Sequence, residues 1–298
     1  MNTPLSRRPR VALELWGPDP IALVQTAVVA ERLGLDAVYL GESPTALNAE
    51  TWTTLGLVAA STSTLRFGPV IANLLDDYRS PVLLARQGAT LARASAGRFD
   101  FRTGVGASRD AGRRWWEPAG VGYPAYGDRW AMADRQLGVL RRLWRGDEID
   151  LGDGAFSLGF EHPPIPITVA ARGARGLDLV RRHANRWEAS YLAVDEFASA
   201  RDAAALDDHI TTSLEVDGFV GGDDGARVWD RAQNERAGED LTVIRRRSLH
   251  GGAGQVAGQI RALHAAGVEQ LVVALHDPHD LDAIETLAAA VARAELAD

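Results

Sequence analysis

The chain has 298 residues, 46% of them hydrophobic, no cysteine, and a formal net charge of −8. The absence of cysteine excludes disulfides, thiolate catalysis and cysteine-ligated metal clusters. All 32 basic residues are arginine, so Schiff-base lysines and P-loop lysines are excluded as well. The acidic charge argues against a general nucleic-acid binder, and no apolar run approaches the roughly 18 residues of a membrane span, so we expect a soluble, cytoplasmic protein with neither kind of partner.

Apolar segments of strand length alternate along the chain with longer segments whose apolar residues recur at helical spacing. The expected strands are 11–15, 37–40, 65–72, 99–104, 167–170, 187–193, 210–220 and 270–275. The expected helices cover 20–33, 50–61, a stretch from Pro81, 129–144, a stretch from the loop 171–176, 254–266 and 280–296. Repeated strand–helix units predict an α/β fold, a (β/α)8 TIM barrel with insertions that forms one domain over residues 1–298.

Three segments interrupt this alternation. Residues 109–124 form an insertion rich in Gly, Arg and Trp, which we expect to be a loop. Residues 148–162 predict a hairpin with its turn at Gly152-Asp153-Gly154. Within 195–250 only the strand 210–220 and a Gly/Asp-rich loop at 221–225 are indicated.

Small and ionisable residues stand at the strand ends, where a barrel of this kind places its site. The fourth strand ends in Gly104-Val105-Gly106, where backbone can approach a ligand closely, and Ala107-Ser108-Arg109 follow, so the run is not a dinucleotide fingerprint. Glu14 lies in an otherwise apolar strand. A carboxyl there is either the structural partner of an arginine or a proton donor with a raised pKa, and Glu42 has the same two interpretations.

The segment Arg172-Gly173-Ala174-Arg175 lies between an expected strand and a helix. A helix N-terminus with guanidinium groups beside it is an anion site, and the alternative is a tight turn with surface arginines. Aromatic residues at the predicted mouth suit a planar ring and an apolar substrate, or else lid packing. The candidates for substrate contact are Trp16, Trp115, Trp116 and His250. The seven histidines show no metal-type spacing, so we expect no metal site.

Four segments occur in an order that resembles the bacterial luciferase-like superfamily. They are Ala-Gly-Arg with Thr-Gly-Val-Gly (96–106), the helix 129–146, Pro-Ile-Thr-Val-Ala-Ala-Arg-Gly-Ala-Arg-Gly-Leu (166–177), and 252–273. The resemblance implies a (β/α)8 barrel that binds FMN or the deazaflavin coenzyme F420 at the carboxyl end of its strands. It also implies an irregular, often cis, peptide within Val70-Ile71-Ala72 that packs against the cofactor ring, with Asn73 in reach of the ring.

The resemblance carries further expectations about the site. Gly104, Gly106, Ala107 and Ser108 would contact the cofactor, with Ser108 as a hydrogen-bond partner, and Arg172, Gly173, Ala174 and Arg175 would bind its phosphate. Glu42-Ser43 stand where many members have Asp-His, so the candidate catalytic residues are Glu14, Glu42 and Ser43. Ala107-Ser108-Arg109 replace an acid that several reductases carry, and therefore no specific reductase mechanism is carried over.

Arginines near the mouth favour F420, whose tail is anionic, over FMN. We therefore predict an F420-dependent oxidoreductase that transfers a hydride between the deazaflavin and a small organic substrate. An FMN-dependent luciferase-like monooxygenase is the alternative, and a degenerate, non-catalytic flavin- or partner-binding barrel is the second. The assembly is left open, with a homodimer as the candidate.

Overall fold

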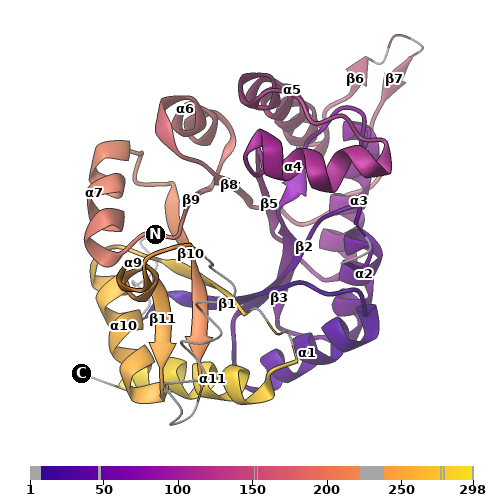
Figure 1. Cartoon of the computed structure of the whole chain (residues 1–298). Helices are drawn as coiled ribbons and strands as arrows, with labels where there is room; N and C mark the ends of the chain where they lie inside the picture. Colours follow the sequence, from indigo (N-terminus) through magenta and orange to yellow (C-terminus); the bar gives the residue numbers. More distant parts are fainter. Residues whose placement is uncertain are drawn as a thin grey trace.

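The structure is a computed structural model that describes residues 8–45, 48–150, 152, 154–221, 238–275, 277 and 279–296. Its strands surround the centre of the molecule and its helices lie outside them (Figure 1). The strand order in the main sheet is β3-β2-β1-β12-β10-β9-β8-β5-β4, with β11 paired to β10, and all of these pairs are parallel. A parallel bridge between Phe67 and Phe99 joins the two ends of this order. The predicted TIM-barrel fold is confirmed.

The elements of the barrel follow the predicted alternation closely. The strands of the main sheet are β1 (Arg10–Leu15), β2 (Ala37–Gly41), β3 (Arg66–Val70), β4 (Ala72–Asn73), β5 (Phe101–Gly104), β8 (Ile167–Ala170), β9 (Arg186–Ser190), β10 (Thr211–Val220), β11 (Ser248–Gly251) and β12 (Gln270–Ala274). The helices are α1 (Pro20–Arg32), α2 (Thr51–Ser61), α3 (Pro81–Ala94), α4 (Arg109–Trp116), α5 (Tyr126–Trp144), α6 (Gly173–His183), α7 (Val194–Ala204), α9 (Leu241–Arg246), α10 (Ala253–Ala265) and α11 (Leu281–Leu296).

Successive side chains of the barrel strands belong to two different apolar clusters. In β1, Val11, Leu13 and Leu15 belong to the large apolar cluster that includes buried residues of the helices. Ala12 belongs to a small separate cluster that also contains Tyr39 and Val272 from the neighbouring strands. Because successive side chains of a strand point to opposite faces, Glu14 shares the inward face of Ala12. The same alternation turns polar side chains of three other strands inward, among them Arg102 in β5, Glu188 in β9 and Glu215 in β10.

The insertion that we expected as a loop is largely helical, so that prediction was wrong. Helix α4 covers Arg109–Trp116 and is followed by a short 3-10 turn, η1 (Glu117–Ala119). Ser108 caps the helix, because its Oγ accepts a hydrogen bond from the backbone N–H of Ala111 at 3.4 Å. The sixth strand also ends earlier than predicted, at Ser190, because Tyr191 adopts a positive φ of 54°. The segment from 195 onward contains most of α7, then β10, α9 and β11.

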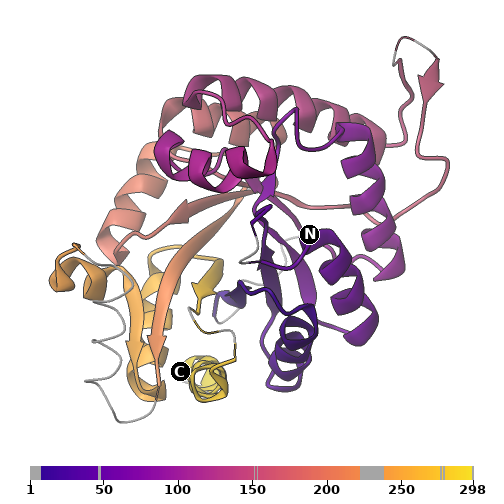
Figure 2. The same ribbon diagram turned by 45° about the vertical axis from the view of Figure 1, so that its right-hand side comes forward.

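The predicted hairpin is present as the antiparallel pair β6 (Ile149–Asp150) and β7 (Ala155–Phe156), which projects from the barrel in both views (Figures 1 and 2). Asp153 of its predicted turn and residues 222–225 of the predicted loop lie outside the described residues. Among the described residues, no helix has the length and apolar character needed to cross a membrane.

Candidate active site

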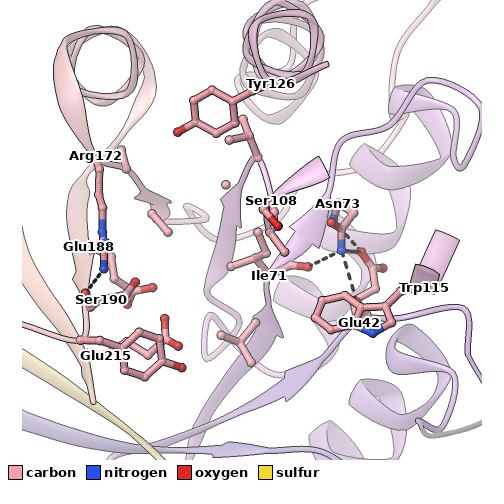
Figure 3. A pocket seen from close by; sticks show the side chains of 18 of the residues that line it. Glu42, Ile71, Asn73, Ser108, Trp115, Tyr126, Arg172, Glu188, Ser190 and Glu215 are labelled. Atoms are coloured by element: carbon pink, nitrogen blue, oxygen red, sulfur yellow. Dashed lines mark hydrogen bonds between the residues drawn. The ribbon is translucent and has the colours of Figure 1, made fainter. Parts of the chain in front are cut away.

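A cavity of about 620 Å³ opens at the carboxyl ends of the barrel strands. Its size lies within the range of small-molecule sites. Predicted cofactor contacts that line it are Val70, Ile71, Asn73, Gly104, Gly106, Ala107, Ser108 and Arg172. Predicted catalytic and substrate residues that line it are Glu14, Glu42, Trp16, Trp115 and Trp116. The structure therefore brings together residues that are far apart in the sequence (Figure 3).

One side of the cavity has almost no long side chains. It is formed by the ends of β3, β5 and β8 and includes Ile71, Gly104, Gly106 and Ala170. The Val70–Ile71 peptide bond is cis, which confirms the expectation for this segment. A Cβ on Gly104 would lie 3.1 Å from both the carbonyl oxygen of Ala170 and Cδ1 of Ile71, so these strand ends are already tightly packed. We call this side the glycine wall.

Glu42 fixes the strand end beside the glycine wall. Its carboxylate is buried and accepts hydrogen bonds from Trp52 Nε1 at 2.6 Å, Arg79 Nη1 at 2.9 Å and the backbone N–H of Asn73 at 2.6 Å. The Asn73 amide in turn donates to the carbonyl oxygen of Ile71 at 3.1 Å. With both carboxylate oxygens engaged, Glu42 positions Asn73 and Ile71, and its catalytic role stays a prediction.

The opposite side of the cavity is acidic, and we call it the acidic side. Glu14 from β1, Glu188 from β9 and Glu215 from β10 line it. Glu188 pairs with Arg102 at 2.5 Å and accepts a hydrogen bond from Ser213 Oγ at 2.8 Å. Glu14 accepts a hydrogen bond from Trp16 Nε1 at 2.6 Å through one oxygen, and its second oxygen is buried without a partner. Figure 3 shows Glu188 and Glu215 close together and across the cavity from Asn73.

Burial raises the pKa values of two carboxyls on the acidic side, those of Glu14 and Glu215. Burial and, second, the negative charge of Glu215 hold the pKa of Glu14 well above its ordinary value. Burial and the charge of Glu188 raise the pKa of Glu215, against the lowering effect of hydrogen bonds from Tyr191 and Ser190. Glu14 and Glu215 therefore keep their protons to higher pH than exposed glutamates do.

Hydrogen-bond donors gather on the α4–α5 side of the cavity. The buried guanidinium of Arg129 donates to the carbonyl oxygens of Val105 and Ala107 just behind Gly106, while its Nε and Nη2 atoms have no partner. Trp130 lines the cavity, and its Nε1 also lacks an acceptor. Arg172 is exposed and donates to the carbonyl oxygen of Ser190. Unpartnered donors of this kind fit an anionic ligand.

Several predicted residues do not line the cavity. Ser43 shares a hydrogen bond with Thr45 at 3.0 Å, and Ala72 is buried in β4. Gly173 begins α6 with a φ of 71°, a left-handed conformation that glycine adopts without strain, but neither it nor Ala174 reaches the cavity. Arg175 lies over α5, where its Nη1 would be 3.1 Å from a Cβ on Gly127. His250 lies in β11, where its backbone N–H donates to Gln259.

Trp130, an aromatic residue expected near the mouth, lines the cavity. Further lining residues were not predicted from the sequence, and they are Val105, Tyr123, Tyr126, Ala170, Ala171, Glu188, Ser190, Tyr191 and Glu215. Two of them carried a usable signal, because Glu188 and Glu215 are ionisable residues within expected strands, as Glu14 is. Tyr126 of α5 carried none, since an aromatic residue there is equally typical of a core helix.

A family model described as luciferase-like monooxygenase matches residues 5–209 of the chain. The chain belongs to this family. The resemblance inferred from its four sequence segments is thereby confirmed.

Named relatives of this luciferase-like chain are F420-dependent dehydrogenases. One is the F420-dependent glucose-6-phosphate dehydrogenase of Intrasporangium calvum. It is 26% identical over an alignment of 327 positions, which covers 91% of this chain and 92% of the relative. Three further dehydrogenases of this name are matched over only about half their length, 51%, 51% and 53%.

Two solved structures show the same fold. An F420-dependent secondary alcohol dehydrogenase, in complex with an F420-acetone adduct, superposes with a TM-score of 0.79 at 15% identity, over 96% of this chain and 99% of its own. The oxygenating constituent of 3,6-diketocamphane monooxygenase from Pseudomonas putida, in complex with FMN, gives a TM-score of 0.70 at 16% identity, over 95% and 96%. Within this fold, then, one neighbour holds F420 and another holds FMN.

Proposed function

We propose that this chain is an F420-dependent oxidoreductase that transfers a hydride between the deazaflavin and a small organic substrate at the carboxyl end of the barrel. The observation that carries the proposal is the pairing, in one cavity, of the glycine wall with an opposite side of buried carboxyls. The first side suits a flat ring, and the second suits a substrate that must gain or lose a proton. The F420-dependent relatives support the same cofactor.

The residues present fit a deazaflavin. Ile71, Gly104 and Gly106 would hold the ring, because backbone and small side chains permit close contact with a planar surface. Arg172 and the unpartnered Trp130 Nε1 would hold the anionic tail, while the charge of Arg129 lies behind Gly106. Arg175, exposed and outside the cavity, has no part in this assignment. When bound, the deazaflavin supplies the hydride donor or acceptor.

Glu14 is the residue that we assign to proton transfer. It lines the cavity, and its raised pKa keeps the carboxyl protonated to higher pH than an exposed glutamate. The Trp16 indole fixes one carboxyl oxygen at 2.6 Å and leaves the other free to contact a substrate.

An FMN-dependent monooxygenase is the second candidate, favoured by the FMN-bound neighbour. Titration of the purified protein with F420 and with FMN, followed by cofactor fluorescence, distinguishes the two. We expect saturable binding of F420 that is at least about tenfold tighter than that of FMN, because the Arg172 guanidinium would serve a tail with more charges. Tighter binding of FMN would favour the monooxygenase, and binding of neither would favour a non-catalytic barrel. A cytoplasmic location and a homodimer stay predictions.

A further inference from the structure

The described residues that line the cavity are strongly biased toward negative charge. Four are acidic, Glu14, Glu42, Glu188 and Glu215, and only Arg172 is basic. Arg172 is exposed and donates to the carbonyl oxygen of Ser190, on the same side of the cavity as Glu188 in Figure 3. The inner part of the cavity therefore offers acceptors and negative charge to a ligand.

Two of the four carboxylates are neutralised by the protein itself. Arg79 pairs with Glu42 at 2.9 Å, and Arg102 pairs with Glu188 at 2.5 Å. Within the described residues, Glu14 and Glu215 have no ion-pair partner. Arg102 is close enough to influence both of their pKa values, but it is fully buried and is not one of the lining residues. Glu14 and Glu215 are consequently the pair whose ionised form a ligand cation would stabilise.

Glu14 carries the clearest sign of a missing ligand. The residue is only 6% exposed, it lines the cavity, and its Oε2 atom has no hydrogen-bond partner. Buried polar atoms are nearly always paired, because an unpaired one loses its hydration without compensation. A donor brought by a ligand would complete this site.

Aromatic rings stand beside these carboxyls. The Trp16 indole is hydrogen-bonded to Glu14, and Tyr191 is hydrogen-bonded to Glu215. Trp115 and Trp116 also line the cavity, and Trp115 reaches it from α4 on the opposite side in Figure 3. Ring faces attract cations as well as apolar groups, so the surroundings favour an organic cation with an apolar body.

We propose that the acidic side of this cavity binds a small organic ammonium ion, a protonated amine, whose N–H groups donate to Glu14 Oε2 and to the carboxyl of Glu215. The inference rests on the proposed function in one respect, since the bound amine would be the substrate of the oxidoreductase. It separates this chain from relatives named for a sugar phosphate, because a phosphate placed beside Glu14 and Glu215 would meet two carboxyls, whereas Arg172, the one basic residue among the described lining residues, is exposed.

Binding of matched ligands to the protein without added cofactor tests the proposal. Benzylamine, benzyl alcohol and benzyl phosphate share one apolar body and differ in charge. Tryptophan fluorescence reports binding, since Trp16 and Trp115 line the cavity. We expect the amine to bind at least about tenfold more tightly than the alcohol, the scale of charge-assisted hydrogen bonds, and the phosphate not to bind.

Substitutions of single carboxyls show which residues carry the preference for the amine. Glu215→Gln and Glu14→Gln should each remove most of the preference for the amine, whereas Glu161→Gln, at an exposed carboxyl outside the cavity, should keep it. Melting temperatures show that each variant is folded, and either acidic-side variant suffices if the other fails. Equal binding of amine and alcohol, tighter binding of the phosphate, or a preference that survives both substitutions would overturn the proposal. Failure of the cofactor titration with an intact amine preference would instead overturn only the proposed function.

Discussion

The substitution Glu14→Gln separates the catalytic from the structural interpretation of this buried carboxyl. Glutamine has nearly the shape of a protonated glutamate and keeps an oxygen for the Trp16 N–H, which now lies 2.6 Å from Glu14 Oε1. It cannot give up a proton. We expect F420 affinity to be unchanged and turnover to fall by roughly 10²-fold or more, the usual size of a general-acid effect.

The stability of the same variant has a predicted sign. Burial and Glu215 raise the pKa of Glu14, so the folded state favours the neutral carboxyl, and the wild-type protein loses stability as pH rises through that raised pKa. At low pH, where both states are protonated, the free energy of unfolding of the variant should lie within about 1 kcal/mol of wild type. At higher pH the variant should become the more stable protein, because glutamine does not ionise.

Two assays on one preparation therefore decide between the interpretations. Steady-state turnover across pH should show a flattened profile in the variant, and urea unfolding at matched pH values should show the stability crossover. A variant with normal kinetics, an unchanged pH profile and a lowered melting temperature would refute the catalytic assignment. It would make Glu14 a structural partner of its neighbours instead.

Three further substitutions test other parts of the structure. Arg172→Ala should weaken F420 binding by about 1–3 kcal/mol. Arg175→Ala, an equal charge change outside the cavity, should leave the F420 dissociation constant unaltered. Equal effects of the two substitutions would contradict the assignment of the anionic tail to Arg172. Gly104→Ala should raise the F420 dissociation constant, since its Cβ meets Ile71 Cδ1 at 3.1 Å, and titration showing wild-type affinity would contradict the glycine wall. Arg102→Met should cost about 3–5 kcal/mol in urea unfolding, because it leaves the Glu188 carboxylate buried without its cation; a loss below about 1 kcal/mol would argue against a buried charged pair.

The barrel was predictable because each of its units repeats a strong local pattern. A segment such as 37–40 is apolar throughout, and Gly34 before it ends the preceding helix, so strand and helix are assigned by short-range chemistry. The cis peptide after Val70 was predictable only through the family resemblance, since nothing in the composition of the segment requires it. Helix α4 was missed because it is only eight residues long and rich in Gly and Arg, and its start depends on the capping oxygen of Ser108.

The site was predictable in part, and its errors have physical reasons. Strand ends converge in a barrel, so Glu14, Gly104 and Arg172 were assigned correctly to the cavity lining. Arg175 was assigned to the same region because it follows a helix start, whereas its side chain lies over α5 in the structure, and its role in cofactor binding stays a prediction. Glu215 was missed because the register of β10 against its neighbours was not known from sequence, and register decides which side chains point inward.

The two-sided cavity is tested most directly by a crystal structure of the protein with F420. We predict the deazaflavin ring against Ile71, Gly104 and Gly106, its anionic tail near Arg172, and open space between the ring and the carboxyls of Glu14 and Glu215. A ring that lies on the acidic side, or a tail that leaves the barrel away from Arg172, would contradict the assignment of the cofactor to the glycine wall and of the substrate to the acidic side.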